Sequence, residues 1–143
     1  MASIQDIQNE IVEEFEYFDD WEDKYGFIID MGKNLKGMDL EFKTDSNIIK
    51  GCQSQVWLHA FLKDDKIVFE AESDAIIVKG IVAMLLRVFS DQTPNDIVNA
   101  DIFFMEKIGM AKHLSPTRAN GLVAMVKQIK LYALAFKTKM SLN

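Results

Sequence analysis

The chain has 143 residues, of which 49% are hydrophobic and two are proline, and this composition fits one compact domain, 1–143, with a substantial core. Its formal net charge of −6 and isoelectric point near 4.9 oppose nucleic-acid binding, which needs a basic surface, and favour protein partners. A single cysteine excludes an internal disulfide and any metal centre built from several cysteines of this chain.

Two features of the sequence argue against membranes and export. Lys79 and Arg87 interrupt the most apolar segment, 75–89, and no run reaches the roughly 18 apolar residues that a membrane span needs. The first ten residues lack the basic start and the apolar stretch of a signal peptide. We therefore expect a soluble, cytoplasmic protein, with neither a membrane nor nucleic acid among its partners.

Apolar periodicity predicts two helices at the start of the chain. Residues 4–18 place apolar side chains at steps of three and four, the spacing of one face of an amphipathic helix. These side chains are Ile4, Ile7, Ile11, Phe15 and Phe18. A second stripe runs from Trp21 to Leu35 and predicts another helix, after which a loop extends to Ser46.

The middle of the sequence indicates a small antiparallel sheet. A β-branched pair at 48–49 predicts a first strand, and the apolar and aromatic segment 56–62 predicts a second. The polar run 50–55 between them is typical of a turn. Residues 67–72 alternate apolar and polar side chains and should pair back on 56–62 as a hairpin. We therefore expect about three strands.

Three further helices are predicted after the sheet. The segment 75–89 is apolar on nearly every side, as expected of a central helix, and Ser73 is expected to cap it with Asp74 in its first turn. Thr93 and Ser115 each precede a proline, a pattern typical of a capped helix start. The predicted fold class is therefore α+β, with a small antiparallel sheet packed against several helices.

The lone cysteine, Cys52, lies in the polar turn between the first two predicted strands. By residue type alone, such a cysteine is most often a small buried hydrophobe. The glycine before it and the polar residues 53–55 after it instead indicate a loop tip, where a nucleophile is useful.

A solitary thiolate is suited to sulfur transfer. It can attack a partner's persulfide and hold the terminal sulfur without being resolved by a second thiol of the same chain. Because a thiol is mostly protonated at neutral pH, we expect a nearby cation, Lys50 or Arg118, or the partner's active site to activate Cys52.

Four blocks of sequence carry a resemblance to a known family. They read GCQSQVW at 51–57, SDA and IVKG within 73–80, TPNDIV at 93–98, and LSPTR and GL within 114–122. In content, order and spacing they resemble the SufE family, and the resemblance spans nearly the whole chain. The sequence departs from the family pattern in 101–113 and in the loop 38–47.

The resemblance implies a fold similar to that of the scaffold protein IscU and a role in iron–sulfur cluster assembly. In that family the loop cysteine, here Cys52, accepts sulfane sulfur as a persulfide from a cysteine desulfurase of the SufS or CsdA kind. The protein stimulates the desulfurase and delivers sulfur to a SufBCD-like scaffold. It is then a carrier rather than an enzyme. The pyridoxal phosphate cofactor belongs to the desulfurase, and we expect no cofactor on this chain.

Six other residues are predicted to belong to the cysteine loop or to contact the partner. They are Gly51, Gln53, Ser54, Gln55, Asp74 and Arg118. Two of them also have structural interpretations, because Asp74 suits a helix N-terminus and Arg118 could pair with it.

Other functions fit the sequence less well. A non-covalent regulatory subunit of a desulfurase remains an alternative, in which the cysteine is incidental. A cluster scaffold needs several cysteines, unless a dimer supplies the ligands. A cysteine hydrolase or peroxidase lacks a resolving cysteine, and the histidine nearest in sequence is His59. His59 and His113 are too few and too separated to predict a metal site.

Overall fold

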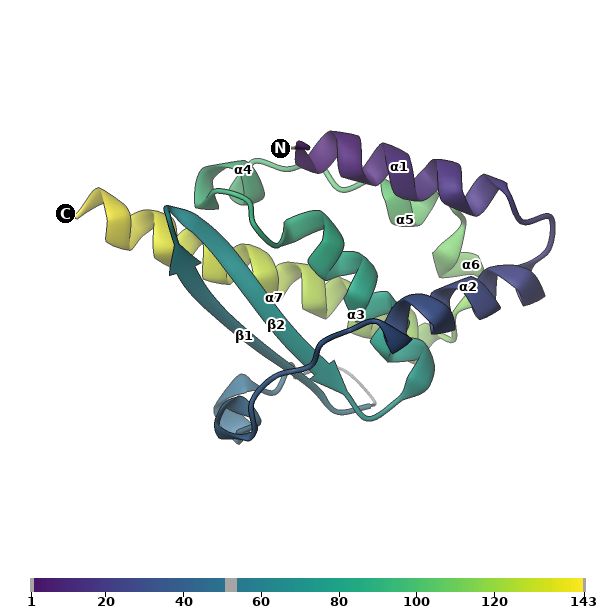
Figure 1. The fold of residues 1–143 in the computed structure, drawn as a ribbon, viewed down its shortest axis with the longest axis horizontal. Helices are drawn as coiled ribbons and strands as arrows, with labels where there is room; N and C mark the ends of the chain where they lie inside the picture. The colour runs from purple at the N-terminus through teal and green to yellow at the C-terminus, as the bar shows by residue number, and fades with distance from the viewer. Residues whose placement is uncertain (1, 51–53, 143) are drawn as a thin grey trace.

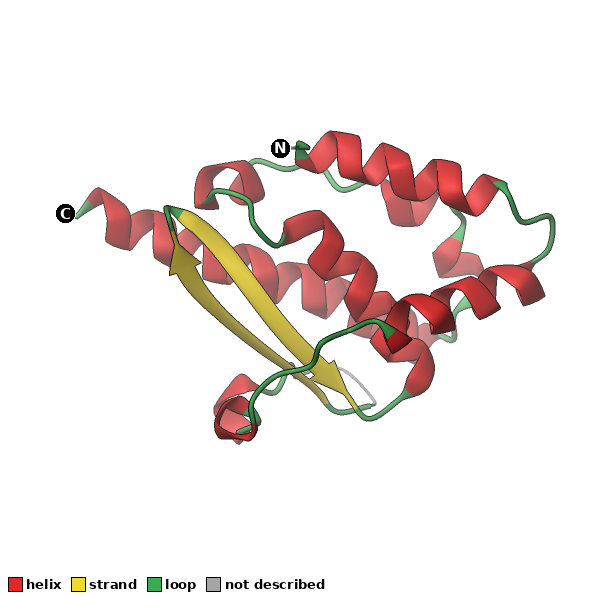
Figure 2. Cartoon of the chain, viewed as in Figure 1, coloured by secondary structure: helices red, strands yellow, loops and turns green. Residues whose placement is uncertain are grey.

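A β-hairpin lies across one side of a group of helices in the computed structural model of the chain, which describes residues 2–50 and 54–142 (Figure 1, Figure 2). The helices are α1 (Ile4–Glu16), α2 (Trp21–Lys33), α3 (Ile76–Phe89), α4 (Pro94–Val98), α5 (Phe104–Lys107), α6 (Met110–His113) and α7 (Pro116–Ser141). The strands are β1 (Val56–Lys63) and β2 (Lys66–Ser73), preceded by the short 3-10 helices η1 (Leu40–Phe42) and η2 (Asp45–Asn47). The α+β class predicted from the sequence is confirmed.

The hairpin follows the predicted alternation of apolar and polar residues. Its two-residue turn places Asp64 and Asp65 at φ 53° and 66°, the left-handed conformation that matches the twist of the flanking strands. The register pairs Val56 with Ser73 and Leu58 with Ala71, so the buried side chains of both strands share one face. That face packs on α3 and supplies one wall of the core.

The predicted number of strands is wrong by one, since the described residues form a two-stranded sheet. The pair 48–49 makes one isolated bridge, from Ile48 to Trp57, instead of a strand. The 3-10 helix η2 ends at Asn47, directly before the bridge, so no extended residues precede Ile48 to lengthen the ladder.

Helices α2 and α3 approach each other closely because glycine occupies both sides of their contact. A Cβ atom added to Gly80 would lie 2.0 Å from the carbonyl oxygen of Ile28, and one added to Gly32 would lie 2.7 Å from the backbone nitrogen of Gly80. Only hydrogen at these positions lets the two backbones pack at this distance. The contact fixes the position of α3, which follows the end of β2 after two residues.

Gln8 is a fully buried polar side chain that ties α1 to the segment before α5. Its amide nitrogen donates to the carbonyl of Asp101 at 3.0 Å, and its side-chain oxygen accepts from the backbone N–H groups of Phe103 and Phe104 at 2.8 and 3.2 Å. The oxygen therefore satisfies two N–H groups at the start of α5 that the helix itself leaves unpaired. Sequence patterns did not predict α5 or α6.

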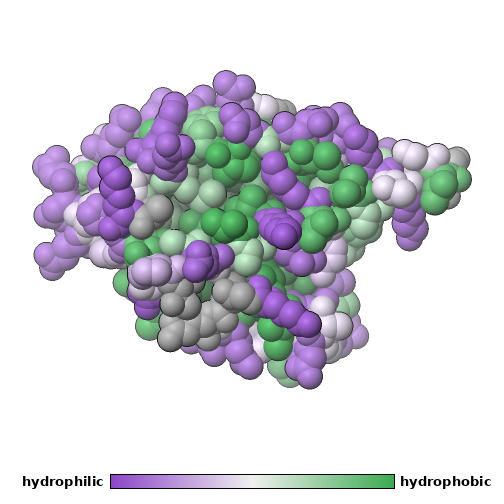
Figure 3. All heavy atoms as spheres, turned by 180° about the vertical axis from the view of Figure 1, so that it is seen from behind, coloured by the Kyte–Doolittle hydropathy of each residue, from purple (hydrophilic) through white to green (hydrophobic). Residues whose placement is uncertain are grey.

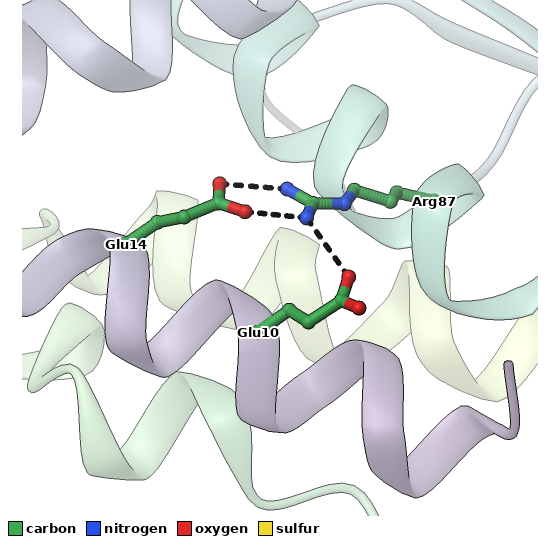
Figure 4. Close-up of polar contacts among 3 residues, drawn as sticks. All are labelled: Glu10, Glu14 and Arg87. Atoms are coloured by element: carbon green, nitrogen blue, oxygen red, sulfur yellow. Dashed lines mark hydrogen bonds and ion pairs between the residues drawn. The ribbon is translucent and has the colours of Figure 1, made fainter.

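Arg87 of α3 forms a bidentate pair with Glu14 of α1 and a further contact with Glu10 (Figure 4). The hydrogen bond from Arg87 lowers the pKa of Glu14, against the opposing effect of burial, and the hydrogen bond to Glu14 raises the pKa of Arg87. The acidic face of α1 is thus partly neutralised where it meets α3.

The predicted helix starts are confirmed in two cases and wrong in one. Thr93 and Ser115 cap α4 and α7 by accepting backbone N–H bonds, each with proline in the first turn. Ser73 does not cap α3: it is the last residue of β2, and α3 begins at Ile76 after Ala75.

None of the helices among the described residues has the length and apolarity required to cross a bilayer.

Candidate functional site

The residues on either side of the predicted cysteine loop meet across a short bridge. The N–H of Ile49 donates to the carbonyl of Val56 at 2.9 Å, next to the bridge from Ile48 to Trp57. The chain leaves this bridge at Lys50 and returns to β1 through 54–55. Gly51, Cys52 and Gln53, which the sequence predicts to form the loop tip, lie outside the described residues.

The end of β2 and the residue after it anchor the segment that leads into β1. The N–H of Gln55 donates to the Asp74 carboxylate at 3.1 Å, and the N–H of Asp74 donates to the Gln55 carbonyl at 3.3 Å. The buried hydroxyl of Ser73 donates to the same carbonyl at 2.9 Å. Both backbone groups of Gln55, three residues after Cys52, are therefore held by residues 73–74.

This anchor explains why the cap predicted for Ser73 is absent. Its hydroxyl reaches across the hairpin to the Gln55 carbonyl, and it accepts only one longer bond, from the N–H of Ala75 at 3.3 Å. Asp74 is exposed, and its carboxylate accepts the hydrogen bond of the Gln55 N–H instead of capping a helix N-terminus. A serine and an aspartate directly after a strand are residue types that often bond to nearby backbone, which was the available signal.

Segment 38–47 covers part of the outer face of the hairpin beside the loop. Phe42 stacks on His59 with ring centroids 3.8 Å apart. The ammonium of Lys43 lies 4.6 Å from the centroid of the Trp57 ring and 3.6 Å from the carboxylate of Glu72. This packing was not predicted, because 38–47 carries no periodic pattern.

The other predicted residues occupy separate places. Ser54 is half-buried, and Lys50 is exposed at the outgoing side of the loop. Arg118 is also exposed, and its backbone N–H donates to Ser115 at 3.3 Å. Among the described residues, no hydrogen bond or ion pair joins Arg118 to Asp74 or to the flanks of the loop. Its role near the cysteine stays a prediction.

The histidines pack on aromatic rings. His113 stacks on Trp21 with centroids 4.1 Å apart, as His59 does on Phe42. Within 2–50 and 54–142, no group of three or more metal-ligating side chains is placed to hold an ion.

The fold defines a small α+β domain in which a polar segment of sequence, 50–55, containing the single cysteine, joins a bridge to a hairpin. The chain belongs to the SufE family: residues 9–133 match the family model described as "SufE: Fe-S metabolism associated domain". The resemblance predicted from the four sequence blocks is confirmed.

Curated relatives and a solved structure agree with this assignment. The chain is 43% identical over 127 residues to a SufE-like protein of Rhizobium meliloti (strain 1021), covering 85% of this chain and 91% of the relative. It is 40% identical over 135 residues to a SufE-like protein of Rhizobium etli, covering 91% and 88%.

A hypothetical protein from Thermus thermophilus, solved in solution, superposes with a TM-score of 0.77 at 16% identity, covering 92% of this chain and 96% of that one. At this identity the likeness shows the fold alone.

Family membership associates the chain with iron–sulfur metabolism, as a sulfur-transfer accessory protein, and implies a cysteine desulfurase partner.

Proposed function

We propose that Cys52 accepts sulfane sulfur as a persulfide from a cysteine desulfurase, and that the chain stimulates the desulfurase and delivers the sulfur to a SufBCD-like scaffold. The observation that carries this proposal is the anchoring of the loop's flanks. The hydrogen bond from Ile49 to Val56 and the three hydrogen bonds between Gln55 and residues 73–74 hold the two sides of the segment 50–55, which contains the only cysteine of the sequence.

The transfer needs no oxidant or reductant. The Cys52 thiolate attacks the terminal sulfur of the desulfurase persulfide, and a new bond forms from its Sγ to that sulfur. The S–S bond of the desulfurase persulfide breaks, and its electron pair leaves with the desulfurase thiolate, which takes up a proton. A scaffold thiolate then repeats the attack on the Cys52 persulfide. The pyridoxal phosphate that generates the first persulfide belongs to the desulfurase.

Anchored flanks favour this chemistry because exchange requires the attacking sulfur to approach along the axis of the bond that breaks. Holding the loop's ends reduces the conformational entropy that is lost when the thiol enters a partner's active site. The exposed carboxylate of Asp74 lies beside Gln55 and is available to contact the partner at the same time.

The rival function is a regulatory subunit that stimulates the desulfurase without accepting sulfur. Alanine production by a SufS-like cysteine desulfurase, with cysteine as substrate and no added reductant, separates the two. We expect the wild-type chain to raise the turnover rate, and Cys52→Ser to bind the desulfurase without raising it. Full stimulation by Cys52→Ser would establish the regulatory subunit instead. Calorimetric titration of both proteins with the desulfurase supplies the binding control.

A further inference from the structure

The charges of the chain are divided sharply along its sequence. All 22 acidic residues lie at or before Glu106, whereas the segment after Glu106 carries seven of the 16 Lys and Arg residues and no acid. Helix α7 contains five of these seven cations. An acidic protein thus presents one long, exclusively basic helix.

Helix α7 also exposes apolar side chains that the core does not use. Val123 is 66% exposed, Leu131 50% and Leu134 49%. At intervals of eight and three residues, they share one side of the helix with Lys127 and Lys130. Figure 3 shows hydrophobic and hydrophilic side chains interspersed on the rear face of the molecule, toward the C-terminal end of α7.

These side chains form one wall of a groove of about 620 Å³, which we call the α7 groove. The opposite wall comes from the end of α4, the segment between α4 and α5, and α5 itself. Its apolar residues are Val98, Ala100, Ile102 and Met105. A neighbouring hollow continues the groove past Ile102 and Met105 toward Ala119 and Lys112.

The charged groups at the α7 groove are arranged by side. Lys127 and Lys130 lie on the α7 wall, and Lys130 also donates to the carbonyl of Ala100 at 2.7 Å, which joins the two walls. Asp101 lies on the opposite wall, and the neighbouring hollow is lined by Glu106 and Lys112. Val123 and Leu134 are separated by eleven residues, or roughly 16 Å of helix, about three turns.

We propose that the α7 groove binds an amphipathic helix of a partner protein, with apolar residues facing the groove and carboxylates along the edge that meets Lys127 and Lys130. Charge complementarity selects this occupant, since α7 offers cations and no acid to whatever lies against it. No residue lining the groove comes from β1, β2 or the described flanks of the cysteine loop. The groove is therefore a surface separate from the described flanks of the cysteine segment.

Two other occupants fit less well. The acidic helices of a second copy, α1 and α2, already bury their apolar sides in the core, with Ile11, Phe15 and Ile28 almost fully enclosed. An anionic membrane surface would meet Asp101 on the second wall and Glu106 in the neighbouring hollow, and a flat bilayer does not enter a two-walled groove.

Designed peptides test the proposal. The probe is an N-acetylated, fluorescein-labelled helix of about sixteen residues, with leucine at every third or fourth position and glutamate along one edge. A second peptide has lysine in place of each glutamate. We expect the glutamate peptide to bind at least about tenfold more tightly by fluorescence anisotropy and to lose affinity as salt rises. Amide chemical-shift changes should fall on 98–105 and 119–134.

Matched variants identify the groove. Leu131→Asp should weaken the glutamate peptide by at least about tenfold. Lys127→Glu should weaken it and strengthen the lysine peptide. Leu142→Asp, which changes an 83% exposed leucine directly after the end of α7 and outside the groove, should do neither. Circular dichroism confirms folding, and persulfide formation on Cys52 should be unchanged in all three.

Three results would overturn the proposal. One is equal or absent binding of the two peptides, and another is binding that Leu131→Asp leaves intact. The third is a different occupant: sedimentation with phosphatidylserine vesicles, or concentration-dependent dimerisation, that Leu131→Asp abolishes while the glutamate peptide does not compete.

Discussion

The close contact between α2 and α3 predicts a large effect of one methyl group. In Gly80→Ala the new Cβ would have to move from 2.0 Å to at least 3.0 Å from the carbonyl oxygen of Ile28, and it also meets the Ile28 side chain at 2.5 Å. The nearest atom belongs to the backbone and cannot move aside as a flexible side chain could. The two helices must therefore separate by about 1 Å.

The magnitude follows from two opposing terms. Overpacking against backbone costs about 3 kcal/mol, the upper end of the usual range. Alanine is about 1 kcal/mol more favourable than glycine within a helix. We therefore expect Gly80→Ala to lower the free energy of unfolding by about 2 kcal/mol, which corresponds to roughly 6 °C in melting temperature for a domain of this size.

Urea unfolding followed by far-ultraviolet circular dichroism measures this change, with Gly26→Ala as the matched control. Gly26 lies on the same helix as Gly32, is exposed, and has no atom within 4 Å of an added Cβ. That variant should gain about 0.5–1 kcal/mol from helix propensity alone. If Gly80→Ala were as stable as the wild type or as Gly26→Ala, the proposed glycine contact would be refuted.

Three further predictions concern polar contacts. Gln8→Ala should cost about 2–4 kcal/mol in urea unfolding, because it leaves buried backbone groups without partners; a loss under about 1 kcal/mol would contradict this. The Arg87 hydrogen bond lowers the pKa of Glu14 below 4.5, so the pair stabilises the fold above that pH and less as pH falls through the lowered value. The difference in unfolding free energy between the wild type and Arg87→Gln should therefore become smaller from about pH 6 to about pH 3. A difference that stays constant with pH would show that the ion pair of Arg87 with Glu14 does not cause it. Asp74→Ala should accelerate hydrogen exchange at the Gln55 amide by about tenfold, whereas Asp74→Asn, which keeps an acceptor oxygen, should change it less; equal rates in all three would show that the anchor is not formed in solution.

Much of the fold follows from local sequence patterns. The hairpin was predictable because its alternation of buried and exposed residues and its turn residues point to the same structure. Helices α4 and α7 were predictable from Thr93 and Ser115, whose caps involve residues only three positions away.

The elements that were missed depend on partners distant in sequence. Helix α5 has four residues, too few for a periodic pattern, and its start is bonded by Gln8, about 95 positions earlier. The sequence predicted a helix cap for Ser73, whereas its hydroxyl bonds to Gln55. This partner was missed because it is 18 positions away in the sequence, across the hairpin. Ile48 illustrates the opposite error, a predicted strand that does not form, because β-branched residues alone do not make a strand.

The candidate site divides in the same way. The sequence predicted Gln55 and Asp74 as site residues, and the structure adds the contact that joins them. The α7 groove was not predicted, because its two walls, 98–105 and 123–134, are brought together only by the tertiary packing of α4 on α7.

Mass spectrometry of the protein can show whether Cys52 carries the sulfur. The chain is incubated with a SufS-like cysteine desulfurase and cysteine, separated from the desulfurase, and digested without reductant. We predict a gain of about 32 Da per sulfur on the peptide containing Cys52, removed by dithiothreitol and absent from Cys52→Ser. A protein that binds and stimulates the desulfurase but never gains this mass would show that Cys52 is not a sulfur carrier.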